Sequence, residues 1–183
     1  MAVQTRAQLQ TKSATVQNET APNANTAARV GGLFDDFADS VTINGERGYA
    51  TMYINSPTGF ETDNGNAILL ETPMTQGEYA GTIFSVSDFT MTYTGATSAS
   101  VRVAVLLSFS GINNREYIFY IAKNGNVISQ SACQNTTQGT HAHSAFSEAF
   151  MKADPNDIFS VYVFANTSSS MTVESLTFSA FTI

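Results

Sequence analysis

Apolar residues are unusually dense in three segments of the second half of the chain. Residues 103–107, 117–121 and 159–164 are apolar at almost every position. Short connections between such segments favour an antiparallel sheet, which normally carries apolar side chains on one face and polar side chains on the other. Because these strands would be apolar on both faces, the second face needs a cover, and no long helices follow residue 43 to provide it. The pattern therefore predicts an obligate oligomer, which we take to be a trimer.

The residues expected at the trimer interface are large and lie in these strands or near the end of the last one. They are Tyr117, Phe119, Tyr120, Tyr162, Phe164 and Phe181. An aspartate in place of Tyr120 or Tyr162 would bury an unpaired carboxylate, which costs several kcal/mol. Either change is predicted to give monomer or aggregate.

From residue 42 onward the apolar period is close to two, which is typical of strands. Asn124-Gly125 predicts a type I′ hairpin turn, and residues 154–157 (Asp-Pro-Asn-Asp) predict a second tight turn. Eight to ten strands in one domain predict a mainly β, antiparallel jelly-roll sandwich over residues 42–183. The candidate strands are residues 50–54, 67–71, 82–86, 89–93, 100–110, 116–123, 127–132, 142–151, 158–165 and 171–183.

The N-terminal 41 residues have a different pattern. Residues 1–24 are polar, with Val3, Leu9 and Val16 as isolated apolar side chains. Such a segment does not bury enough surface to fold alone, so it is either a disordered tail or an extended arm that docks on a partner. Residues 25–41 form a second segment, in which apolar residues recur at spacings of three and four, as in a coiled coil. The recurring residues are Ala27, Val30, Phe34, Phe37 and Val41. They predict a short helix, which forms either a trimeric stalk or an amphipathic helix packed on its own jelly roll.

Composition excludes several classes of function. The net charge of −7 argues against nucleic acid as a partner, because phosphates attract Lys and Arg. No apolar run approaches the ~20 residues that span a bilayer, so we expect no membrane insertion. The first residues lack the apolar core of a signal peptide, which predicts synthesis in the cytosol. The single cysteine, Cys133, has no basic neighbour in sequence, so it is interpreted as a small strand residue and not as a nucleophile.

Candidate chemistry is confined to the two histidines, His141 and His143. Residues two apart on a strand share a face, so a trimer with this strand at its axis would gather six imidazoles into a metal site. The alternative is two exposed histidines beside a turn. No catalytic triad, phosphate-binding loop or zinc-type spacing is present, so we expect neither an enzyme nor a cofactor.

Residues 84–183 resemble the trimeric jelly-roll heads of the tumour-necrosis-factor and complement-head type, in the form common on bacteriophage virion fibres. The resemblance rests on the Ser-Phe-Ser-Gly end of a long strand at residues 108–111 and on the hairpin at residues 121–125. It also rests on the turn at residues 154–161 and on the approach to the last strand at residues 165–168. The turn departs from the usual pattern, with Asn156 in place of Gly and Phe159 in place of Ile. Residues 5–9 and 25–40 are similar to the N-terminal arms of phage fibre and head-fibre proteins, including those of crAss-like gut phages.

The resemblance implies a non-enzymatic virion structural protein, made in the bacterial cytoplasm. Residues 1–24 would dock on other virion proteins, residues 25–41 would form the stalk, and residues 42–183 would form a homotrimeric head. A stalk this short favours a head fibre or capsid decoration protein over a tail fibre. The alternative is a tail-fibre adhesin tip that binds a host-surface glycan through Tyr53, Phe60 and Tyr79. A secreted cytokine-like protein is disfavoured by the absence of a signal peptide.

Overall fold

In the computed structural model, described residues are 10–11, 14, 48–54, 56–80, 83–139 and 141–183. A compact unit spans Arg47–Ile183. The N-terminal arm and stalk predictions lie outside the described residues, namely those for Val3, Leu9, Val16, Ala27, Val30, Phe34, Phe37 and Val41. No helix in the described ranges is long and apolar enough to cross a membrane.

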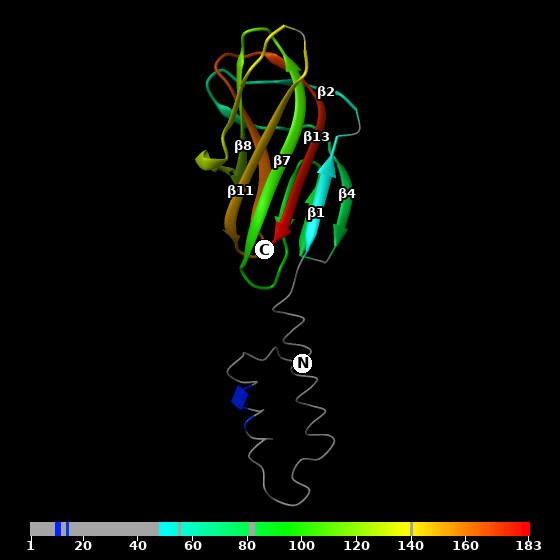
Figure 1. The fold of residues 1–183 in the computed structure, drawn as a ribbon, viewed down its shortest axis with the longest axis vertical. Helices are drawn as coiled ribbons and strands as arrows, with labels where there is room; N and C mark the ends of the chain where they lie inside the picture. The colour runs from blue at the N-terminus through cyan, green and yellow to red at the C-terminus, as the bar shows by residue number, and fades with distance from the viewer. Residues whose placement is uncertain (1–9, 12–13, 15–47, 55, 81–82, 140) are drawn as a thin grey trace, which may run out of the picture. The chain divides into compact units, whose positions relative to one another are not determined.

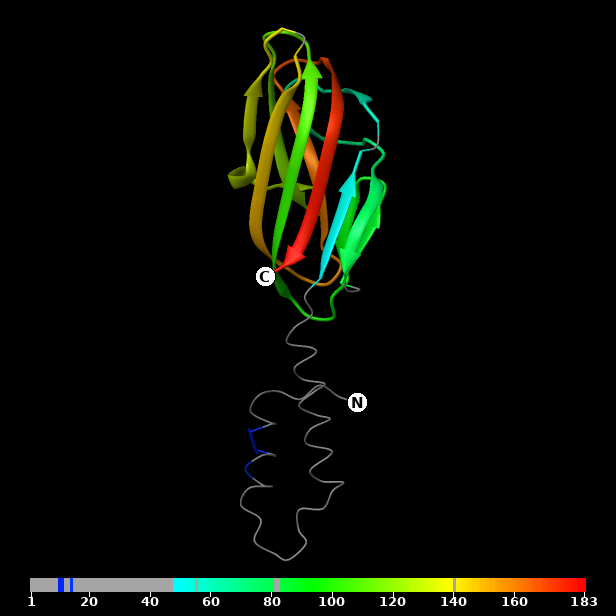
Figure 2. The ribbon, with the colours of Figure 1, turned by 45° about the vertical axis from the view of Figure 1, so that its right-hand side comes forward.

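The compact unit is a sandwich of two antiparallel sheets, which confirms the predicted mainly β jelly roll (Figures 1 and 2). The first sheet has the order β11 (His143–Ala153), β7 (Ala99–Gly111), β13 (Ser170–Thr182), β1 (Tyr49–Tyr53) and β4 (Thr75–Ala80), with β2 (Thr58–Glu61) also paired to β13. The second sheet has the order β10 (Cys133–Thr136), β8 (Glu116–Lys123), β12 (Ile158–Ala165), β6 (Thr90–Tyr93) and β5 (Phe84–Ser87), with β3 (Ala67–Leu69) on β12 and β9 (Asn126–Val127) on β8.

Most predicted strands are present, and two of them, β8 and β12, have the predicted bounds. Three strands were not predicted. β2 and β4 are mostly polar and contain glycine, and β10 lies just beyond the expected strand at residues 127–132, although its first residue, Cys133, was interpreted as a strand residue. The expected strand at residues 127–132 is instead the end of β9 followed by a 3-10 turn, η1 (Ser129–Ser131).

The two predicted turns lie side by side and are joined by hydrogen bonds. Asn124 and Gly125 both have positive φ, 52° and 76°, which confirms the type I′ turn. Asn156 also has positive φ, 72°, and asparagine tolerates this region better than most residues, so it can replace the usual glycine. Asp157 accepts a hydrogen bond from the Asn124 amide at 2.7 Å and pairs with Lys123 at 2.6 Å. Burial works to raise the pKa of Asp157, but these partners and the Asp154 backbone N–H outweigh it and hold the pKa below its usual range.

The core between the sheets contains a cluster of perpendicular aromatic rings. The Phe109 ring lies 5.5 Å from the Tyr117 ring and 4.9 Å from the Phe119 ring, between centroids. Tyr117 and Phe119 are completely buried in the single chain. This corrects the expectation that they line a trimer interface, because completely buried side chains leave no surface for a second copy.

The Tyr117 hydroxyl closes the core at one end through hydrogen bonds with the Ser169 hydroxyl, at 3.0 Å, and the Ser170 carbonyl, at 3.3 Å. Gly111 permits this position, because a Cβ there would lie 2.6 Å from the Tyr117 hydroxyl oxygen. The close approach therefore requires glycine at residue 111.

The first described residue of the sandwich, Gly48, and the last residue, Ile183, lie at the same end of it. Gly48, where the described sandwich begins, is hydrogen-bonded to Thr182 at the end of β13, and Ile183 is bonded to Ser100 near the start of β7. β7 then runs thirteen residues, roughly 40 Å at ~3.3 Å per residue, to the opposite end (Figure 1). We call that opposite end, formed by residues 110–115, 137–139 and 141, the distal end.

Candidate oligomerisation surface on the first sheet

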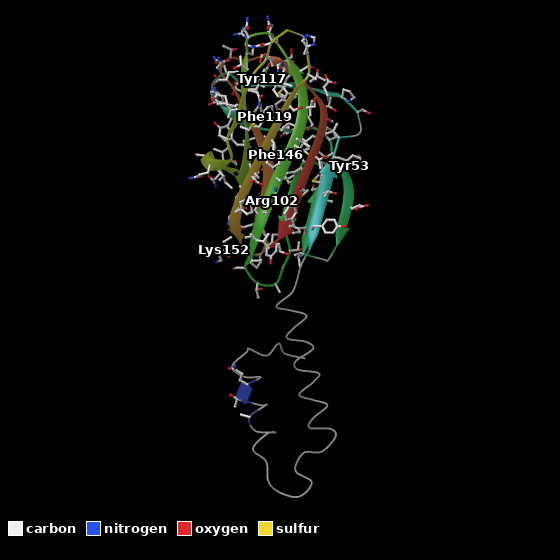
Figure 3. All side chains as sticks on the ribbon, in the orientation of Figure 1. Tyr53, Arg102, Tyr117, Phe119, Phe146 and Lys152 are labelled. Atoms are coloured by element: carbon white, nitrogen blue, oxygen red, sulfur yellow. The ribbon has the colours of Figure 1, made fainter. Side chains whose placement is uncertain are left out.

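The outer face of the first sheet exposes large apolar side chains at the middle of its longest strands. Phe146 of β11 lies opposite Leu106 of β7, and the two side chains are 50% and 56% exposed. Phe150, 61% exposed, lies opposite Arg102. β11, β7, β13 and β1 lie side by side in Figure 1, and Figure 3 labels Phe146 on β11 and Tyr53 on β1. The face continues onto β13 and β1, because Phe181 pairs with both Arg102 and Tyr49. We call it the apolar face, and it consists of Tyr49, Tyr53, Leu106, Phe146, Phe150 and Phe181.

The aromatic residues of β11 point outward because the inward positions beside them are occupied by small residues. Ala145, Ser147 and Ala149 face the core and are buried. η1 packs against this inner face, and the Ser147 hydroxyl donates a hydrogen bond to the Ser131 carbonyl. Side chains alternate between faces along a strand, so the residues between the small ones must face out.

An ion pair lies within the apolar face. Arg102 donates from Nη2 and Nε to one Glu148 carboxylate oxygen, at 2.6 and 2.8 Å. The guanidinium carbon also lies 5.1 Å from the centre of the Phe181 ring and 5.8 Å from that of Phe150. The pair is one-third exposed and contributes little in the isolated chain. Its importance would rise if a second protein covered the face and left neither charge in water.

The extent of the apolar face suits a subunit contact. Five of its side chains expose 38–61% of their surface, which at ~200 Å² for an aromatic residue sums to roughly 500 Å². Apolar patches of this size mark interaction sites on soluble proteins, and one side of a standard protein interface covers about 800 Å². The apolar face is therefore large enough to form most of one side of such an interface.

Of the other predicted interface residues, Phe181 belongs to the apolar face, whereas three lie on the second sheet. Tyr120 and Tyr162 pair across β8 and β12, and both are half-buried on the outer face of that sheet. Phe164 is half-buried on the same face, opposite Ile118. A role for these three in a trimer stays a prediction.

The sequence interpretation missed Leu106, Phe146 and Phe150. The signal in the sequence is that Phe146, Glu148 and Phe150 stand at alternate positions of one strand, with alanine or serine between them. A glutamate on the same face as two phenylalanines indicates that the phenylalanines face out.

The two histidines lie near the distal end and are not equivalent. β11 begins at His143, so His141 precedes the strand and the strand rule does not place both on one face. His141 is exposed, and Nε2 of half-buried His143 accepts a hydrogen bond from the Gln138 N–H at 3.1 Å. Within the described part of the chain, no three His, Cys, Asp or Glu side chains gather as a metal site. A metal shared between copies stays a prediction.

The residues suggested for glycan binding are dispersed. Tyr53 is in the apolar face, Phe60 packs half-buried against the core, and the Tyr79 side chain lies outside the described residues. Cys133 is a half-buried residue of β10, as interpreted from its neighbours.

No protein-family model matches the sequence, and no curated protein matches it. Solved structures do match the fold. The PRD1 vertex protein P5 matches at a TM-score of 0.54 and 7% identity, over 74% of this chain and 96% of that one. The globular domain of zebrafish complement 1qA protein matches at a TM-score of 0.50 and 7% identity, over 72% and 94%. Murine APRIL at pH 8.0 matches at a TM-score of 0.50 and 8% identity, over 74% and 99%. The fold is the jelly roll that these proteins share.

Proposed function

We propose that the protein is a non-enzymatic structural protein of a bacteriophage virion that assembles as a homotrimer through the apolar face. The observation that carries the proposal is the group of exposed aromatic and aliphatic side chains at the middle of β7 and β11. The largest apolar patch on a single chain is often an interaction site, and a second copy of the chain is a partner always present at matching concentration.

A trimer is proposed in preference to a dimer because residues 84–183 resemble jelly-roll heads that are trimeric. In a three-fold ring each copy contributes two different surfaces, so the face of one copy meets the β11 edge of the next. The sequence resemblance to trimeric jelly-roll heads favours the same closed arrangement.

The virion location is supported by the resemblance of the N-terminal segments to phage fibre arms. The match in fold to a vertex protein, P5 of PRD1, agrees with it. In this proposal residues 1–24 bind other virion proteins, residues 25–41 form the stalk, and the jelly roll is a head fibre or capsid decoration.

Two measurements test the proposal. Sedimentation velocity of the full chain should give a trimer of about 59 kDa, three times 19.6 kDa. A monomer at concentrations of tens of micromolar would refute the assembly. Separately, protein lacking residues 1–24 should remain trimeric but fail to bind particles that lack the protein, and unchanged binding would refute the arm as anchor.

The second candidate is a tail-fibre adhesin tip that binds a host-surface glycan. The distal end favours it, because that end lies opposite the point where the chain enters the sandwich and is the one that an anchored protein presents outward.

A further inference from the structure

Arg115 at the distal end differs from the other cations that the structure describes. Arg102, Lys123 and Lys152 each pair with a carboxylate. In the described ranges no carboxylate pairs with Arg115, and its buried Nε has no hydrogen-bond partner. Buried donors without a partner are rare in folded proteins and call for an explanation such as a missing ligand. In a chain of net charge −7, a guanidinium without an acid is conspicuous.

The backbone around Arg115 is held firmly by the neighbouring loop. The Arg115 N–H donates to the Thr137 hydroxyl at 3.1 Å, and the Thr137 N–H donates to the Arg115 carbonyl at 2.9 Å. The Gly139 N–H donates to the Asn113 side-chain oxygen at 2.6 Å. A site built on such cross-linked loops loses little conformational entropy when it binds a ligand.

An open hollow of about 310 Å³ lies on the first sheet, at the end of β7 and the start of β13. Its lining is Ser110, Gly111, Ile112, Ser170, Met171 and Thr172. The buried Thr137 hydroxyl connects it to the guanidinium-bearing residue, because it donates to the Ile112 carbonyl and accepts from the Arg115 N–H. The hollow thus combines hydroxyl groups with the exposed side chain of Ile112, and the Thr137 hydroxyl links it to the backbone of Arg115.

We propose that the distal end binds an acidic saccharide, with Arg115 contacting its oxyanion and the hollow holding an adjoining sugar ring. A guanidinium matches the planar or tetrahedral oxygen array of a carboxylate or a sulfate. Ile112, 45% exposed, is the one strongly exposed large apolar residue among those described at this end. Amides and hydroxyls dominate the rest, which suits a sugar better than the apolar core of a protein interface. The inference gives the adhesin alternative a site and a ligand class, and it does not require the trimer.

Calorimetric titration of the full chain tests the proposal. The probes are sialyllactose, with lactose as its neutral parent, and N-acetylglucosamine 6-sulfate, with N-acetylglucosamine as its parent. Arg115→Gln removes the charge and keeps a side chain of similar polarity. Lys152→Gln is the matched control, because Lys152 is an exposed cation on β11, away from the distal end, and loses the same charge. Circular dichroism checks that both variants remain folded.

One acidic probe should bind and its neutral parent should not. Arg115→Gln should weaken that binding at least about tenfold, as expected for a charge-assisted hydrogen bond, and Lys152→Gln should leave it unchanged. The probe that binds distinguishes a carboxylate from a sulfate. Equal binding of acidic and neutral sugars, an equal loss in both variants, or no binding of either acidic probe at millimolar concentration would overturn the proposal. A trimer that binds no acidic sugar would refute this site alone, whereas a monomer that binds one would refute only the assembly.

Discussion

Replacing Phe150 by alanine should weaken self-association strongly and change the fold of the single chain little. The side chain is 61% exposed in the isolated chain, so covering it removes about 100 Å² more apolar surface than covering alanine would. At ~25 cal/mol per Å² this is about 2.5 kcal/mol per subunit. Three subunits lose about 7 kcal/mol, which raises the trimer dissociation constant by roughly 10⁵. The midpoint concentration scales with the square root of that constant, so it should rise by about several hundredfold.

The free energy of unfolding of the monomer should change by less than about 1 kcal/mol, since the substitution removes mainly one cation–π contact with Arg102. Sedimentation velocity measures the association. The concentrations should span roughly a thousandfold, which covers the predicted rise in the midpoint concentration. Ile158→Ala is the control, because Ile158 is 41% exposed but belongs to β12 of the other sheet. If Phe150→Ala associates like the native chain, or if Ile158→Ala weakens association equally, the apolar face is not the contact.

Three further predictions concern stability and the ion pair. Gly111→Ala should destabilise the chain by about 1–3 kcal/mol in urea unfolding, because the added Cβ meets the hydrogen-bonded Tyr117 ring; native-like stability would contradict the close approach. Asp157→Asn should lower stability by about 1–3 kcal/mol at neutral pH. The pKa of Asp157 is lowered in the folded state, so its carboxylate stabilises the fold above the unfolded pKa, near 3.8, and this stabilisation is lost as pH falls through the folded pKa. The unfolding curves of the native chain and of Asp157→Asn should therefore converge in acid. Glu148→Gln should change monomer stability by less than about 1 kcal/mol but lower the trimer fraction in sedimentation, because Arg102 would be covered without its partner.

The fold was predictable where local pattern and tertiary environment agree. β8 and β12 have the predicted bounds because their apolar runs end at turns whose residues demand positive φ, such as Asn124-Gly125. β2 and β4 were not predictable, because Gly59 and Gly77 interrupt polar segments that form strands only by pairing with β13 and β1. Pairing partners far apart in sequence determine such strands, and propensity does not reveal them.

The candidate site was less predictable than the fold. The sequence interpretation correctly inferred that apolar surface remains after one sandwich is built, but Tyr117 and Phe119 are buried inside it. Which face of a strand meets the core depends on the opposite layer. In β11 the η1 turn takes the space under the strand, and the larger residues Phe146 and Phe150 are left outside. Shifting a strand by one residue would exchange these faces, so the choice is a property of the assembled sandwich.

The central position of β13 has a consequence for synthesis. β13 lies between β7 and β1; it pairs with β7 along most of its length and with β1 over residues 177–181. Until residues 170–182 have left the ribosome, β7 and β1 have no neighbour on those edges, and the inner faces of the first sheet are in water. Until then the first sheet stays open and prone to aggregation, so its folding cannot be completed before β13 has emerged. Chains that stop short of residue 170 should precipitate or be degraded, so only complete copies of this strand reach assembly.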